Sequence, residues 1–132
     1  MLALDTNVLL RYVLDDDARQ SALATAVIHR ASAGDESLFL SDIVVCEAVW
    51  VLSKGYKFTR EEIVVLLRDL FRARHIEFRA TDELSRALDA YESGKGDFTD
   101  YLIREHARAA ACENVVTFDK VLLKERGFIA AK

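Results

Sequence analysis

The sequence predicts an α/β fold with a mainly parallel sheet of four to five strands, because short apolar segments alternate with longer helical patterns along the chain. Parallel strands need long crossovers, and right-handed helical crossovers place helices on both faces of the sheet. A second observation is that the first and fourth apolar segments both stop at an aspartate, Asp5 and Asp119. Ligands of such sheets bind beyond the carboxyl ends of the strands, so these positions are candidates for a functional site.

The chain begins with a predicted strand over residues 2–4, and a helix follows Asp5. Apolar residues recur there at intervals of three and four, and the acidic run 15–17 ends the helix. A second helix is predicted over residues 18–33 from the same spacing, and Gly34 is a typical helix stop.

The next strand is predicted over residues 37–40. Ser41 and Asp42 are typical of helix starts, and the helix that they open continues until Gly55. Residues 59–73 form another predicted helix, because a threonine followed three residues later by a glutamate matches a capping box.

The rest of the chain repeats the alternation of strand and helix. The predicted elements are a strand over residues 76–79, a helix capped by Thr81, a loop over 93–96, a helix from Asp97 or Thr99 to Ala111, and strands over 114–118 and 128–130.

The composition predicts one globular domain over residues 1–132, without a membrane-spanning segment or a signal peptide. Cys46 and Cys112 show no metal-binding or disulfide spacing, so we expect free thiols and a cytoplasmic protein. The net charge of −4 argues against a broad basic surface for nucleic acid. A metal-loaded acidic pocket would leave the remaining surface near neutral, so nucleic-acid binding stays open.

Five acidic residues, at four places in the sequence, could form one site. Asp5 and Asp119 end strands, Glu47 lies in a mostly apolar helical segment, and Asp97 and Asp100 are three residues apart at a helix start. Carboxylates at close range repel one another unless a cation lies between them. With oxygen ligands alone, a hard ion such as Mg²⁺ or Mn²⁺ is expected.

Each acid also has a purely structural interpretation. Asp5, Asp97 or Asp100 could cap a helix, and Asp119 could end its strand in a turn. Glu47 could lie on an exposed helix face, although an unpaired charge in an apolar helix is costly. Because Asp97 and Asp100 share a helix face, either could be the ligand and the other a capping group.

The chain resembles the PIN domain family. The resemblance rests on Asp5-Thr6-Asn7 after the first strand, a glutamate in the third helix, the segment Asp97-Phe98-Thr99-Asp100-Tyr101-Leu102-Ile103, and Val115-Val116-Thr117-Phe118-Asp119. These motifs follow in order over essentially the whole chain, whose length is similar to that of VapC-type ribonuclease toxins. The resemblance implies a three-layer α/β/α fold and a Mg²⁺- or Mn²⁺-dependent endoribonuclease.

The resemblance also implies roles for individual residues and partners. The acidic quartet would be Asp5, Glu47, Asp100 and Asp119, with Asp97 as an additional acid; Thr6, Asn7 and Thr117 would support the site. The implied partners are an RNA substrate, a cognate antitoxin and a second copy in a homodimer, without a membrane.

Four arginines are candidates for RNA contacts. Arg68 and Arg72 lie four apart on one predicted helix, and Arg104 and Arg108 repeat this spacing beyond Asp100. The alternative is that each arginine pairs with a nearby acid on a solvated face. Arg104 is the preferred candidate because it lies one turn from Asp100.

Two other functions compete with the nuclease. An aspartyl-phosphate phosphatase would need a second aspartate two residues after Asp5, where the chain has Asn7. A non-catalytic PIN-like domain could use its acidic pocket to bind a basic peptide. Measured turnover separates this binding domain from an enzyme.

Overall fold

The computed structural model describes residues 1–34 and 36–132, and it has α/β architecture. The elements in chain order are β1 (Leu2–Ala3), α1 (Thr6–Leu14), α2 (Ala18–Ser32), β2 (Leu38–Phe39), α3 (Asp42–Trp50), the π-helical turn η1 (Val51–Gly55), α4 (Arg60–Arg72), β3 (Ile76–Glu77), α5 (Thr81–Ser93), α6 (Phe98–Ala109), β4 (Val115–Thr117), the 3₁₀ turn η2 (Leu122–Lys124) and β5 (Phe128–Ala130). The predicted alternation of strands and helices is confirmed.

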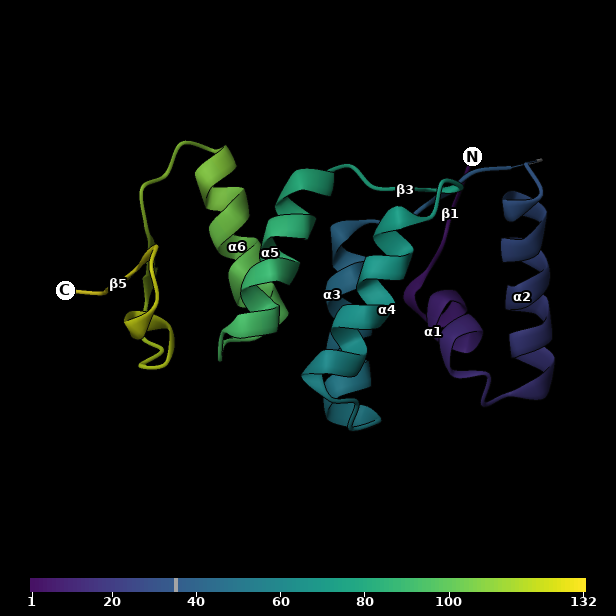
Figure 1. Cartoon of the computed structure of the whole chain (residues 1–132), viewed down its shortest axis with the longest axis horizontal. Helices are drawn as coiled ribbons and strands as arrows, with labels where there is room; N and C mark the ends of the chain where they lie inside the picture. The colour runs from purple at the N-terminus through teal and green to yellow at the C-terminus, as the bar shows by residue number, and fades with distance from the viewer. Residues whose placement is uncertain (35) are drawn as a thin grey trace.

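The strands form two separate parallel sheets. One has the order β1-β2-β3, with Leu2 opposite Leu38, and the other contains β4 and β5, with Val115 opposite Phe128. The predicted α/β fold with parallel strands is confirmed, but the larger sheet has three strands, fewer than the four to five predicted. Helices α5 and α6 lie between the two sheets along the long axis of the molecule, so β4 does not reach β1 (Figure 1).

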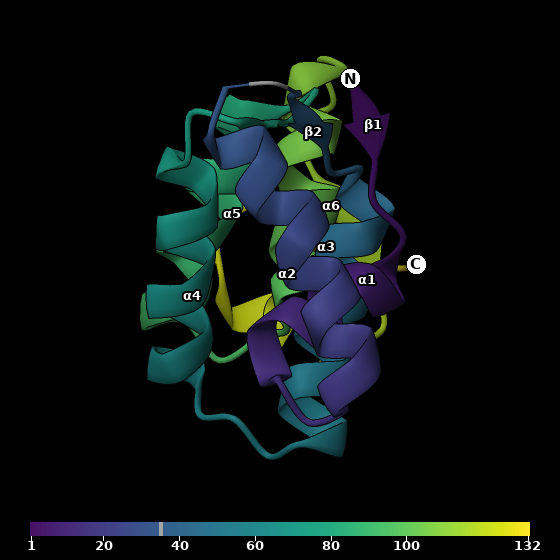
Figure 2. The same ribbon diagram turned by 90° about the vertical axis from the view of Figure 1, so that its right-hand side faces the viewer.

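The largest part of the core surrounds the three-stranded sheet. Leu38 and Leu40, in and next to the central strand β2, are fully buried, and they pack with buried side chains of α3, η1, α4 and α5. The edge strand β1 differs, because Leu2 is 49% exposed. Figure 2 shows β1 and β2 side by side above α1 and α3.

Local signals set most helix starts. Ser41 caps α3 through its hydroxyl, which accepts from the Val44 amide, and Thr59 opens α4 with the predicted capping box. Thr81 does not cap α5; the cap position is Ala80, and Thr81 is the first helical residue. Among the described residues, no helix combines the length and apolarity needed to cross a bilayer.

Candidate functional site

The N-terminal acids Asp5 and Glu47 come together through Thr6. Asp5 follows β1 and caps α1, where its Oδ1 accepts a hydrogen bond from the Thr6 amide at 2.8 Å. The buried Thr6 hydroxyl donates to Oε1 of Glu47 on α3 at 3.4 Å. Both carboxylates are exposed. Asp5 therefore has the capping role that its position allows, and its second oxygen and the Glu47 carboxylate stay accessible to a ligand.

A second acidic group lies at the start of α6. Asp97 is the N-cap, and its amide donates to Oδ2 of Asp100 at 3.0 Å. Burial raises the pKa of Asp100, the hydrogen bond from Asp97 opposes this, and the charges of Asp97, Asp119 and Glu125 raise it further. Repulsion among neighbouring carboxylates is the property expected of a cation-binding group.

Asp119 belongs to this second group and also stabilises a turn. Its amide donates to the Thr117 hydroxyl at 3.0 Å, and its Oδ1 accepts from the Val121 amide at 2.8 Å. The side chain is exposed. Thr117 thus holds the backbone of Asp119 in place, which is a supporting contact next to the acid.

The group of Asp5 and Glu47 and the group of Asp97, Asp100 and Asp119 do not form a common metal site among the described residues. Among the described residues, no three His, Cys, Asp or Glu side chains lie close enough to hold a metal ion together. Asp97 and Asp100 line a groove of about 240 Å³, whereas Glu47 lines a neighbouring one of about 310 Å³. Thr99 lines both grooves and so stands between Glu47 and Asp100.

Asn7 lines neither of the two grooves that contain Glu47, Asp97 and Asp100. It lines a cavity of about 260 Å³ between α1 and α2, together with residues such as Val8 and Leu23. In this arrangement its side chain is placed to contact an occupant of that cavity.

The sequence matches the PIN domain family model over residues 2–128. The chain belongs to the PIN domain family. It is also similar to a protein named VapC ribonuclease from Aquifex aeolicus (strain VF5), with 27% identity over 128 residues that cover 97% of this chain and 93% of the relative.

The candidate RNA-binding arginines of this PIN domain differ in how far they are already paired. Arg68 forms ion pairs with Asp89 and Glu92 on α5, at 3.1 and 2.8 Å. Arg72 is exposed, and it forms no ion pair among the residues that the structure describes. Of this pair on α4, Arg72 is therefore the more available for a phosphate.

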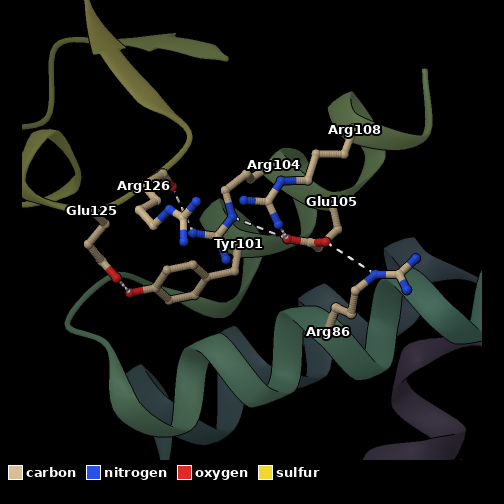
Figure 3. A network of polar contacts seen from close by, with 7 residues as sticks. All are labelled: Arg86, Tyr101, Arg104, Glu105, Arg108, Glu125 and Arg126. Carbon is tan, nitrogen blue, oxygen red and sulfur yellow. Dashed lines mark hydrogen bonds and ion pairs between the residues drawn. The ribbon is translucent and has the colours of Figure 1, made fainter. Parts of the chain in front are cut away.

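Arg104 and Arg108 of the PIN domain both pair with the nearby acid Glu105, but this acid is buried and does not lie on a solvated face. Glu105 is 3% exposed, and its carboxylate contacts Arg104, Arg108 and Arg86 at 3.1, 3.0 and 3.4 Å (Figure 3). A signal was present in the sequence, because Glu105 lies seven residues after Phe98 on the apolar stripe of α6.

A second contact that the sequence analysis missed fixes the C-terminal strands of the PIN domain to α6. The buried Tyr101 hydroxyl donates to Glu125 and accepts from the Gly96 amide, at 2.6 and 2.8 Å. Arg104 donates to the carbonyl of Arg126 at 3.0 Å (Figure 3). Glu125 and Arg126 lie between η2 and β5, and β5 pairs with β4. The bonds to Tyr101 and Arg104 therefore attach to α6 the same C-terminal segment that carries Asp119.

Proposed function

We propose that this PIN domain is an endoribonuclease that hydrolyses RNA phosphodiester bonds with Mg²⁺ or Mn²⁺, with Asp5, Glu47, Asp100 and Asp119 as its acidic residues. The observation that carries the proposal is the placement of carboxylates at the ends of β1 and β4 and at the start of α6. Family membership and the name of the Aquifex aeolicus relative support it. Asp97, Thr6, Asn7 and Thr117 are the proposed supporting residues.

The donor atoms suit the proposed ion, but their arrangement in one copy does not. All four acids offer carboxylate oxygens, the ligands that Mg²⁺ and Mn²⁺ prefer. No three of them meet in the described chain, so the ion requires the Asp5 group and the Asp100 group to approach each other. The rise in the pKa of Asp100 supports a cation at that position, since a nearby positive charge would relieve the repulsion.

The proposed biological role is that of a toxin in a toxin-antitoxin pair. Its partners would be an RNA substrate, a cognate antitoxin and a second copy, in the cytoplasm. An antitoxin segment with a lysine or arginine would suit the acidic groups, because its cation would replace the metal electrostatically. Arg72, which forms no ion pair among the described residues, is the preferred phosphate contact. Arg104, the candidate preferred from the sequence, is bound to Glu105 and to the Arg126 carbonyl, and the more exposed Arg108 is also bound to Glu105.

Variants of the acids test the nuclease. Asp5→Asn and Asp119→Asn should lower RNA cleavage at least about 100-fold while leaving the fold intact. Mutation of residues that only hydrogen-bond to metal ligands already lowers metal affinity or activity by about 10- to 100-fold, and loss of a ligand should cost more. EDTA should abolish the wild-type activity. Cleavage is followed on total RNA by mapping transcript ends, with Asp69→Asn, an exposed acid on α4, as the matched control.

Full cleavage by either folded variant, or in excess EDTA, would contradict the metal-dependent mechanism.

The second candidate function is a non-catalytic domain that binds a basic peptide. It is favoured by one observation, the absence of an assembled group of three acids among the described residues. It predicts peptide binding without RNA cleavage by the wild-type protein at any concentration of Mg²⁺ or Mn²⁺.

A further inference from the structure

The single tryptophan of the chain is exposed. Trp50 is the last residue of α3, and 65% of it is accessible to solvent. Tryptophan is highly buried on average, so a ring that stays in water calls for a reason. Trp50 lines the groove of about 240 Å³ that also contains Asp97 and Asp100. Its ring is therefore available to a ligand that reaches Asp100.

Lys54 adds a positive charge to the same groove. It lies four residues after Trp50, it is exposed, and it forms no ion pair in the part of the chain that the structure describes. It belongs to the π-helical turn Val51–Gly55. Such turns are rare and are frequently found at functional sites. The end of α3 thus presents an aromatic ring and an ammonium group to one groove.

The opposite wall of this groove is fixed before any ligand arrives. The buried rings of Tyr91 and Phe98 line it and pack edge to face, with their centroids 6.1 Å apart. Arg60 lies 4.1 Å from the centre of the Tyr91 ring and donates to the carbonyls of Tyr91 and Gly96, at 2.8 and 2.9 Å. These contacts hold the chain just before Asp97, so a ligand does not have to order it.

The groups along the groove match the two parts of a nucleotide. The face of an indole ring stacks on any nucleobase, and an ammonium group binds a phosphate. An apolar segment of a protein would cover Trp50 but would leave Lys54 without a partner, which is costly for a buried charge. The chemistry of the groove therefore favours a nucleotide over an apolar peptide.

We propose that Trp50 and Lys54 form a nucleotide subsite next to Asp100, in which the base of one unpaired RNA nucleotide stacks on Trp50 and a neighbouring phosphate contacts Lys54. The choice of RNA as the ligand rests on the proposed function. A base within a duplex is stacked on its neighbours and cannot lie against Trp50, so the subsite selects nucleotides in loops or single strands. Trp50 is then a residue that positions the substrate and determines specificity.

The emission of Trp50 tests the stacking directly. Because the chain has one tryptophan, its fluorescence reports on this ring alone. A short single-stranded oligoadenylate is added with Mg²⁺ to the Asp119→Asn protein, in which cleavage is blocked and the groove is unchanged because Asp119 does not line it. We expect saturable quenching. An abasic ribose-phosphate oligomer of equal length and charge should cause none.

Variants in the same background test the affinity through the fluorescence anisotropy of a labelled oligoadenylate. Trp50→Leu should weaken binding about 10-fold, and Trp50→Phe, which keeps an aromatic ring, should weaken it less. Lys54→Gln should weaken binding and lower the salt dependence by about one phosphate contact. The matched control is Val65→Ala, since Val65 is 63% exposed on α4 and does not line the groove.

The outcomes separate this subsite from the nuclease itself. Quenching that requires the base, together with the loss of affinity in Trp50→Leu, supports the subsite whether or not the wild-type protein cleaves RNA. No quenching, equal quenching by the abasic oligomer, or unchanged affinity in Trp50→Leu overturns it, even if the wild-type protein is an active nuclease. Cleavage by the wild-type protein is measured separately and decides the proposed function.

Discussion

Asp100 combines partial burial with three acidic neighbours, and this makes its protonation state sensitive to its surroundings. Burial is the largest cause of the raised pKa, followed by the opposing hydrogen bond from Asp97. A carboxyl whose pKa is higher in the folded state than in the unfolded state favours folding only when protonated. Its stabilising contribution is therefore complete below the unfolded value and is lost as pH rises through the folded value.

We predict that Asp100→Asn raises the thermal midpoint of the metal-free protein at pH 7. Asparagine keeps an oxygen that can accept from Asp97 and removes the repelled charge. The difference from wild type should shrink as pH falls and vanish below the ordinary carboxyl pKa of 3.8. Thermal unfolding from pH 3 to 8 in EDTA measures this. Asp69→Asn should show no such trend, and an equal trend in that control would refute the assignment.

Glu105 is a buried anion among three guanidinium groups. We predict that Glu105→Ala lowers the free energy of unfolding by about 3 kcal/mol, because removal of one partner from a buried ion pair leaves the others uncompensated. Partial exposure of Arg86, at 60% of its side chain, keeps the loss at the lower end. Urea unfolding measures it, with the exposed Glu113→Ala as control. A loss below 1 kcal/mol would show that water replaces the carboxylate.

At the scale of elements, α6 connects the acidic groups to the C-terminal strands. Its first turn carries Asp100, its buried stripe carries Tyr101 and Glu105, and its outer contacts reach the segment from Glu125 to Phe128. Arg104 lies over the rings of both Tyr101 and Phe128, which adds a cation–π contribution to its hydrogen bonds.

We predict that Tyr101→Phe loosens the C-terminal unit from α6. The change removes the hydroxyl shared by Glu125 and the Gly96 amide, and its expected cost is about 1–3 kcal/mol because the Gly96 donor is left unsatisfied. Hydrogen exchange should become faster over residues 115–130 than in β1 to β3. Tyr56→Phe, which removes an exposed hydroxyl bound to Asp16, is the control. Uniform exchange changes would argue against a local clasp.

At the scale of the whole molecule, β1 lies in one sheet and β4 in the other, so the arrangement separates Asp5 from Asp119. The proposed metal site therefore requires these two ends of the strands to approach each other.

The sequence by itself determined the features that depend on neighbouring residues. The alternation of apolar segments gave the order of strands and helices, and cap residues such as Ser41 and Thr59 set helix starts, because these signals act within one helical turn. The acids at the ends of β1 and β4 were found in the same way.

Only the tertiary structure decided which strand edges meet and which acids share a group. Pairing of β1 with β2 and of β4 with β5, without a bond between β1 and β4, depends on packing between residues far apart in sequence. The same packing buries Glu105 among arginines and places Asp119 with Asp100 instead of Asp5. Charge and periodicity locate such side chains on their own elements, but the distances between elements follow from how the helices fill the space between the sheets.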